Sequence, residues 1–246
     1  MLILALESSA TACSAALCRD GVLRAQFYAD SGLTHSRTLL PMAESMLVSS
    51  GVQLDDVDVI AVAAGPGSFT GLRIGVATAK GLAWKGDKDC APCSSLESMA
   101  WPLAHLEGNL IVCAMDARRN QVYNALFLAS GDRLERLSPD RAISLADLAE
   151  EVKKYKNSKI VVGDGAKLCY NALLEQGLDA KLAPQPLRMQ SAWGVARTAQ
   201  RLAEEGALVK GRELVPVYHR LSQAERERLE RESQSPKNDK GEHANV

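Results

Sequence analysis

Val57-Asp-Val-Ile-Ala-Val-Ala-Ala-Gly-Pro-Gly-Ser-Phe-Thr-Gly-Leu-Arg-Ile-Gly75 is the most informative stretch of the sequence. Its first eight residues are almost all apolar, which predicts a buried strand over 57–64. A glycine-rich loop, 65–71, comes next, and the apolar residues after it recur at helical spacing to about Trp84. A buried strand that passes through a glycine loop into a helix indicates an α/β protein.

The same order of elements occurs a second time along the chain. Residues 2–18 and residues 110–129 each have the pattern strand, polar turn, strand. In both cases helices follow, and then a strand that enters a glycine loop, Gly65-Pro-Gly67 in the first case and Gly163-Asp-Gly165 in the second. Two similar α/β halves with a cleft between them would explain this repetition.

Periodicity and capping residues predict the other elements and the domain boundaries. We expect strands over 22–28 and 159–162, and helices over 34–50, 94–106, 144–154, 168–176, 191–205 and 222–231. The expected domains are a first half, 1–106, a second half, 107–213, a C-terminal segment, 214–232, that packs back on the first half, and a disordered polar tail, 233–246.

Composition restricts the functional class. The 246 residues are 46% apolar and 24% charged, with a net charge of −1, so the whole chain does not attract nucleic acid. The apolar start, residues 1–6, is too short for a signal peptide and no basic residue precedes it. No apolar run approaches the roughly 18 residues of a membrane span. We therefore expect a cytoplasmic protein that does not enter a membrane.

The six cysteines and four histidines do not indicate a disulfide framework or a metal site. Several cysteines lie in apolar runs, which favours buried, reduced thiols. Cys90 and Cys93 have the spacing of a redox motif, but a packing role explains this single pair better. No two histidines have the i, i+4 spacing of metal ligands.

Two interpretations of the cleft residues remain open. The loop 65–71 has the parts of an anion cradle, namely glycines, hydroxyl groups and a helix N-terminus, although it lacks the lysine of a Walker A loop. Acids after the strands, Glu7 and Asp116, could hold a Mg²⁺-nucleotide. The alternative is that the loop is a turn whose glycines let two helices meet, and that each acid caps a turn. If a nucleotide binds, the candidate residues are Glu7, Ser8, Gly65, Gly67, Asp116, Gly163 and Gly165.

The segment Gly65–Gly75 resembles the TsaB family, also called YeaZ. Further segments are similar to this family in the same order along residues 2–220. They are Leu4–Ser9, His35–Arg37 with Leu40-Pro41, Ser94–Glu97, Asp116–Tyr123, Gly163–Ala166 and Pro216–Tyr218. In two places the sequence departs from the family, because Glu7 stands where Asp is frequent and His219 where an apolar residue is usual.

The resemblance implies an actin-like ATPase fold with two ribonuclease H-like halves. It implies a non-catalytic subunit that forms a homodimer, pairs with the homologous catalytic subunit TsaD and acts with TsaE. The complex would transfer threonylcarbamoyl groups to N6 of adenosine 37 in tRNAs that read ANN codons, and this chain would meet tRNA only through the complex. We expect no resident cofactor; ATP or ADP with Mg²⁺ at a subunit interface is the alternative.

The family's partner surface is a helical bundle in the first half, which here corresponds to the helices near 35–50 and 70–84. Apolar stripes and small residues on these helices agree with a close helical contact. Gly75 and Gly81 are interior helical glycines, which close packing of another helix would explain. The predicted partner residues are His35, Leu39, Leu40, Ala43, Met46, Leu47, Thr70, Leu72, Arg73, Gly75, Val76 and Ala79.

The resemblance also predicts that this chain lacks the catalytic metal site. TsaD binds its metal through His-x-x-x-His, and the aligned segment here is Ser95-Leu-Glu-Ser-Met99. We therefore predict no catalytic and no metal-binding residues. The alternatives are a nucleotide-dependent transferase or kinase of the same fold, a protease, for which neither nucleophile nor ligands are found, and a redox role of Cys90 and Cys93.

Overall fold

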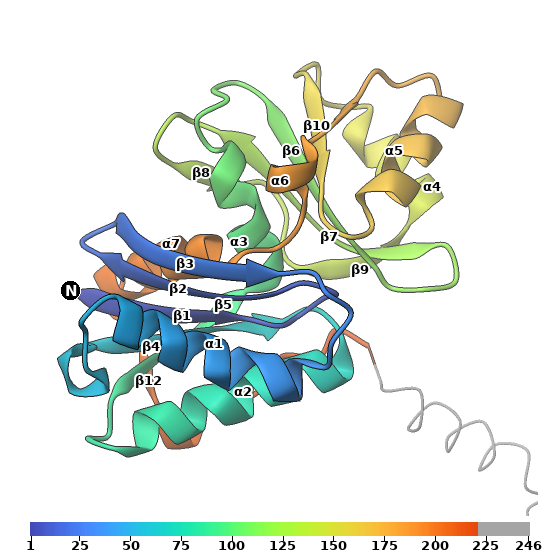
Figure 1. Ribbon diagram of the computed structural model, residues 1–246. Coiled ribbons are helices and arrows are strands. Elements are labelled where there is room, and N and C mark those ends of the chain that lie inside the picture. Colours follow the sequence, from blue (N-terminus) through green and yellow to red (C-terminus); the bar gives the residue numbers. More distant parts are fainter. Residues whose placement is uncertain (221–246) are drawn as a thin grey trace, which may run out of the picture.

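Two mixed β-sheets, one in each half of the molecule, form the framework of the protein (Figure 1). The structure is a computed structural model and describes residues 1–220. The strand order of the first sheet is β3 (Val22–Ala29), β2 (Cys13–Arg19), β1 (Leu2–Glu7), β4 (Val59–Gly65), β5 (Asp89–Ser94), β12 (Val209–Lys210). That of the second sheet is β11 (Lys181–Leu182), β10 (Lys159–Val162), β6 (Leu110–Asp116), β7 (Gln121–Ala129), β8 (Leu134–Arg136), and β9 (Arg141–Ser144) also pairs with β7.

The internal repeat expected from the sequence is confirmed by the pairing of the strands. β1 pairs antiparallel with β2 and parallel with β4, and β6 pairs antiparallel with β7 and parallel with β10. The next strand in each half, β5 or β11, joins parallel on the far side. Each half therefore has the ribonuclease H-like strand order, and the pair of halves is the arrangement of the actin-like ATPase fold.

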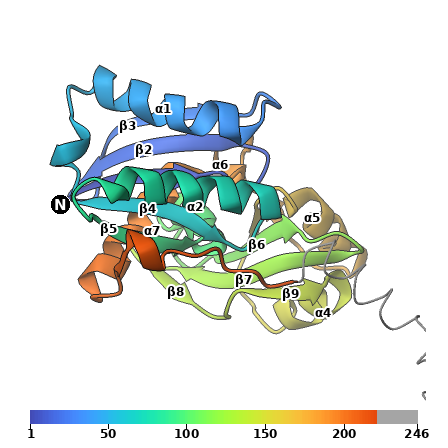
Figure 2. The same cartoon turned by 90° about the horizontal axis from the view of Figure 1, so that it is seen from below.

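Helices cover both faces of the first sheet (Figures 1 and 2). On one face lie α1 (His35–Ser49) and α2 (Phe69–Trp84), and on the other lies α7 (Ala192–Glu204). Because side chains alternate along a strand, Leu4 of β1 packs in the core under α1 and α2, whereas Ile3 packs in the core under α7. Burial on both faces explains why β1 is apolar up to its last residue, Glu7, and why β4 carries no polar side chain.

The second sheet packs against α4 (Leu145–Val152) and α5 (Ala166–Glu175) on one face. On its other face lies α3 (Ser95–Ala100), which ends in the short 3₁₀ helix Trp101–Leu103. This helix is shorter than the predicted 94–106, because the chain tightens at Pro102. Three further short helices complete the described chain: α6 (Gln185–Arg188) and the 3₁₀ turns Leu54–Asp56 and Gly211–Glu213.

The predicted second half, 107–213, extends too far along the chain. α7 contacts β1, β2, β4 and β5, and β12 pairs with β5. Both elements are therefore part of the first half, although they follow the second sheet in sequence. Sequence order alone could not show this return of the chain. The predicted helix 222–231 and the tail 233–246 lie outside the described residues.

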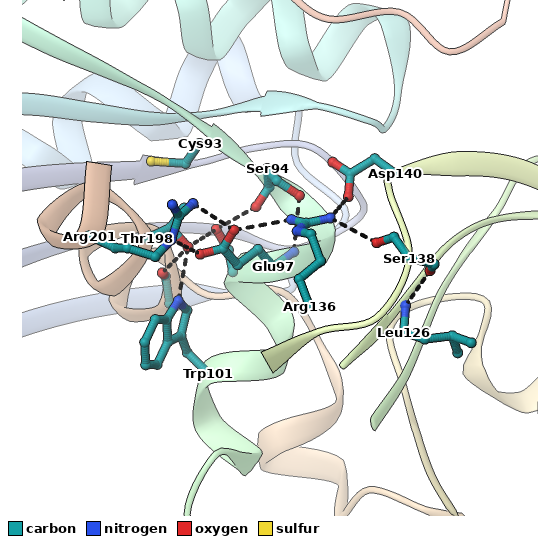
Figure 3. A network of polar contacts seen from close by, with 12 residues as sticks. Cys93, Ser94, Glu97, Trp101, Leu126, Arg136, Ser138, Asp140, Thr198 and Arg201 are labelled. Atoms are coloured by element: carbon teal, nitrogen blue, oxygen red, sulfur yellow. Dashed lines mark hydrogen bonds and ion pairs between the residues drawn. The ribbon is translucent and has the colours of Figure 1, made fainter. Parts of the chain in front are cut away.

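A buried glutamate joins the two halves (Figure 3). Glu97 of α3 accepts hydrogen bonds from Arg201 of α7, at 2.7 Å, and from Arg136 of β8, at 3.1 Å. Only 5% of the Glu97 side chain is exposed. Since Arg201 packs with the first sheet and Arg136 belongs to the second, one carboxylate fixes the position of both.

Candidate functional site: the cleft between the halves and the outer helices

A cleft of about 690 Å³ lies where the two halves face each other. Its walls come from the turn after β1, the glycine loop after β4, the turn after β6, the loop after β10, and the C-terminal segment. The lining residues are Ser9, Ala10, Thr11, Gly67, Ser68, Phe69, Met115, Asp116, Ala117, Arg118, Tyr123, Asp164, Met189, Val217, Tyr218, His219 and Arg220. The volume lies in the usual range of small-molecule sites, roughly 300–1,000 Å³.

Three acids lie in or beside the cleft: Asp116 and Asp164 line it, and Glu7 is buried two residues before the lining residue Ser9. Glu7 is completely buried, and burial raises the pKa of its carboxyl group to about 7, although Ser9 N donates a hydrogen bond to Oε1 at 2.5 Å. Burial also raises the pKa of Asp164, which accepts a hydrogen bond from Gln190 Nε2 at 3.0 Å. Asp116 is exposed and accepts a hydrogen bond from Arg118 N at 2.7 Å. Asp164, in the middle of the predicted glycine loop, was not among the predicted site residues.

The acids alone do not make a metal centre. Carboxylates such as Asp116 and Asp164 are the oxygen donors that Mg²⁺ prefers. Within residues 1–220, however, no three His, Cys, Asp or Glu side chains are arranged as a set of metal ligands. Ser95 and Met99 are both buried, and Met99 packs in the core of the second half. The cleft therefore offers single carboxylates to a ligand rather than a built metal cage.

The glycine loop is occupied by contacts within the chain. At Gly65, where φ is +145°, an added Cβ would lie 2.2 Å from the carbonyl oxygen of Val217. At Gly67 it would lie 2.4 Å from the carbonyl oxygen of Ser9. Ser68 N already donates to that same Ser9 oxygen, at 2.7 Å. These contacts favour the interpretation of the loop as a turn, but its glycines approach the end of β1 and the C-terminal segment rather than a second helix.

The corresponding glycines of the second half also contact the backbone closely. Added Cβ atoms would lie 2.1 Å from the Ala114 carbonyl oxygen at Gly163 and 2.8 Å from Asp116 N at Gly165. Ser8, another predicted cleft residue, is buried and donates its hydroxyl hydrogen bond to the Gly71 carbonyl oxygen at 2.9 Å. Of the seven predicted residues only Gly67 and Asp116 line the cleft, and the others lie in the strand ends and turns around it.

The predicted partner surface needs a correction, because most of its residues are core residues. Side chains from α1 and α2 that form the apolar stripes are buried against the chain's own first sheet. They are Leu39, Ala43, Met46, Leu47, Leu72, Val76 and Ala79. An amphipathic stripe identifies the buried face of a helix, and that face is covered here by the sheet. These residues are therefore not available to another subunit in this structure.

Gly75 and Gly81 also differ from the prediction of a close second helix. At Gly75 an added Cβ would lie 2.6 Å from Ser8 Oγ and 3.1 Å from Val62 Cγ2, so the close approach is between α2 and the first sheet. At Gly81 an added Cβ would have no described atom within 4 Å beyond its own helix. The two glycines therefore have different environments.

The remaining predicted partner residues lie at or near the surface. Leu40, Thr70 and Arg73 are exposed, and His35 is half-buried, with Nε2 donating to the Ala10 carbonyl oxygen at 2.7 Å. The most exposed apolar side chains on these helices were not among the predicted partner residues. Val48 of α1 is 80% exposed and Trp84 of α2 is 88% exposed. An apolar side chain off the main stripe is the signal that could have identified Trp84.

The cysteines are all free and buried, as predicted. Cys90 and Cys93 lie in β5, three residues apart, so their side chains point to opposite faces of the sheet. Cys90 packs under α2 and Cys93 under α7. Burial raises the pKa of Cys90 to about 11 and raises that of Cys93 well above its usual value. This geometry contradicts a redox role for the pair.

The topology of two ribonuclease H-like sheets and the cleft between them define a protein of the actin-like ATPase fold. Residues 30–227 match the family described as TsaD: tRNA N6-adenosine threonylcarbamoyltransferase. The chain belongs to the TsaB (YeaZ) branch of this family, as its similarity to named relatives shows.

The similarity to these relatives extends over nearly the whole chain. The tRNA threonylcarbamoyladenosine biosynthesis protein TsaB of Bacillus subtilis is 34% identical, over 94% of this chain and 99% of that protein. The Escherichia coli protein of the same description is 30% identical, over 89% and 95%. The solved structure of YeaZ from Pseudomonas aeruginosa superposes with a TM-score of 0.76 at 28% identity, over 88% of this chain and 99% of that one. Among residues 1–220, no helix has the length and hydrophobicity needed to cross a membrane.

Proposed function

We propose that this chain is a non-catalytic partner subunit in the synthesis of threonylcarbamoyladenosine on tRNA. It would form a complex with TsaD and act with TsaE in the transfer of the threonylcarbamoyl group to N6 of adenosine 37, in the cytoplasm. The names of its relatives support the pathway. The absence of histidine at both ends of Ser95–Met99 supports the assignment of catalysis to the partner rather than to this chain.

The observation that carries the partner role is the outer surface of α1 and α2. Leu40, Val48 and Trp84 are large apolar side chains that their own fold leaves exposed. Tryptophan side chains that become buried in a contact often dominate its affinity. We therefore place the contact with TsaD, and the homodimer contact, on the outer faces of these helices rather than on the buried stripes.

The decisive experiment is the formation of threonylcarbamoyladenosine on unmodified tRNA. Purified TsaD, TsaE, the threonylcarbamoyl-adenylate synthase and ATP are incubated with and without this protein. We expect product only when both this chain and TsaD are present. Product in the absence of this chain would contradict the proposal, and product in the absence of TsaD would favour a nucleotide-dependent transferase of the same fold.

The location of the interface has its own test. Trp84→Ala and Leu40→Asp should each weaken binding to TsaD about tenfold or more in calorimetry, because they remove apolar contact area. Leu174→Asp is the matched control, since Leu174 is 45% exposed and lies on α5 in the other half. Equal weakening by all three variants would place the contact elsewhere.

A further inference from the structure

The C-terminal strap, which we define as residues 214–220, spans the cleft from one half to the other. Before it, the 3₁₀ turn Gly211–Glu213 packs on the C-terminal part of α2, and an added Cβ at Gly211 would lie 3.1 Å from Ala83 Cβ. The chain then runs back along α2 toward its first turn (Figure 2). Four consecutive strap residues, Val217 to Arg220, line the cleft.

The strap is attached to the first half by a backbone hydrogen bond and an aromatic contact. Val217 N donates to the Ala64 carbonyl oxygen, at the end of β4, at 2.7 Å. The ring of Tyr218 stacks on the ring of Phe69, with centroids 4.6 Å apart and an interplanar angle of 26°. Arg73 connects both, because its guanidinium lies 3.8 Å from the Phe69 centroid and its Nε donates to the Tyr218 hydroxyl at 3.0 Å.

The strap is attached to the second half by Arg220. Its Nη1 donates a hydrogen bond to the carbonyl oxygen of Ala117, in the turn after β6. Ala117 is the neighbour of Asp116 and Arg118, both of which line the cleft. The strap is therefore attached to both sides of the same cleft. Only His219 separates Tyr218, which contacts the first half, from Arg220, which contacts the second.

The attachment on the first half is built into the loop after β4. Gly65 has a positive φ, and any side chain there would collide with the Val217 carbonyl. The first two turns of α2 supply both Phe69 and Arg73. A segment that only happened to lie on the surface would not need a glycine beneath it and a stacked ring beside it.

We propose that the C-terminal strap is a releasable latch, which holds the two halves at one opening and covers part of the cleft between them. Leu214 is buried in the core of the first half and anchors the start of the strap. The attachments of residues 217–220 lie at the surface, with Val217 and Tyr218 partly exposed, so residues 215–220 can detach without disturbing either core. Detachment of the strap would expose the opening of the cleft and, at the same time, the side chain of Phe69 at the start of α2. This proposal goes beyond the subunit role and does not depend on it.

Two measurements on the full chain test the latch. The first is amide hydrogen exchange at Val217, whose N–H reports attachment to Ala64. Tyr218→Ala removes the stacked ring and the Arg73 bond, and should speed this exchange about tenfold. Tyr218→Phe keeps the ring and should have a smaller effect. The matched control is Val215→Ala, a change at an exposed residue of the same strap.

The second measurement is the distance between the halves. Spin labels are placed at Thr70→Cys and Arg119→Cys, two exposed positions on opposite sides, while the native cysteines are buried. With the wild-type strap we expect one narrow distance distribution. Tyr218→Ala and Arg220→Ala should each broaden it or shift it to longer distances, and Val215→Ala should not. If Tyr218→Ala does not fold stably, the distance measurement on Arg220→Ala alone still tests whether the strap restrains the halves.

The outcomes separate the proposal from its alternatives. Unchanged Val217 exchange in Tyr218→Ala would show that the strap is not held by the aromatic contact. An unchanged distance distribution in both variants would show that the strap does not restrain the halves. Either result overturns the latch.

Discussion

Glu7 ends β1 with its carboxyl group fully buried, beside the polar turns that surround the cleft. Burial disfavours the charged form of a carboxyl group, and here it raises the pKa from 4.5 to about 7. The hydrogen bond from Ser9 offsets only part of this effect. An acid in this state is neutral in mildly acidic solution and charged in mildly basic solution, so the stability of the fold depends on pH.

The sign of this dependence follows from the two pKa values. Between pH 4.5 and about 7 the unfolded chain has released the proton of Glu7 while the folded chain retains it, so the free energy of unfolding falls as pH rises. The difference amounts to about 3 kcal/mol. We expect Glu7→Gln to match the wild type near pH 4.5 and to be more stable above pH 7.

Urea unfolding at several pH values between 4.5 and 8 measures this difference directly. Glu44→Gln is a suitable control, because it removes an exposed carboxylate from α1. A constant difference between Glu7→Gln and the wild type across the range would contradict the assignment.

Two of the glycines of α2, Gly75 and Gly81, should respond in opposite ways to the same substitution. Gly75→Ala places a methyl group 2.6 Å from Ser8 Oγ, and such overpacking typically costs about 1–3 kcal/mol. Gly81→Ala meets no described atom and should stabilise the helix by about 1 kcal/mol. Thermal unfolding of both variants checks the assignment of the close approach to the sheet. Stabilisation by both changes would be the contrary result.

At the scale of single elements, local signals located the longer helices α1, α2, α4, α5 and α7 to within a few residues. Ser144, the first residue of the predicted helix 144–154, is the N-cap of α4, and its hydroxyl oxygen accepts a hydrogen bond from Asp147 N at 3.1 Å. Ser144→Ala should lower the free energy of unfolding by about 1 kcal/mol, whereas Ser144→Asp should retain most of the cap. Chemical denaturation of the three proteins measures this, and equal loss in both variants would argue against capping.

β5 shows where local signals were insufficient. Its sequence, Asp-Cys-Ala-Pro-Cys-Ser, contains a proline and has polar ends, so it lacks a clear strand pattern. It forms a strand because β4 and β12 provide partners on both sides. The apolar stripes of α1 and α2 were assigned to a partner surface for a related reason, since periodicity locates the apolar face of a helix but does not tell what covers that face.

At the scale of the whole molecule, Glu97 connects the halves through two arginines. Glu97→Gln would leave Arg201 and Arg136 without their shared carboxylate partner, and removal of one member of a buried ion pair costs on the order of 3 kcal/mol. Asp55→Asn is the control, because its ion pair with Lys85 is exposed to solvent and should contribute much less to stability. Urea unfolding compares the two variants. Losses of similar size would contradict a central role for Glu97.

The sequence by itself determined the fold class, the repeat of two halves, the buried cysteines and the family, because these follow from local patterns and from motifs such as Gly65–Gly75. Tertiary structure alone decided which half α7 joins, what the stripes of α1 and α2 face, and why Gly65 must be glycine. Each of these depends on contacts between segments far apart in the chain, such as Gly65 with Val217. The local sequence around such a residue does not identify the distant segment that it contacts in the folded protein.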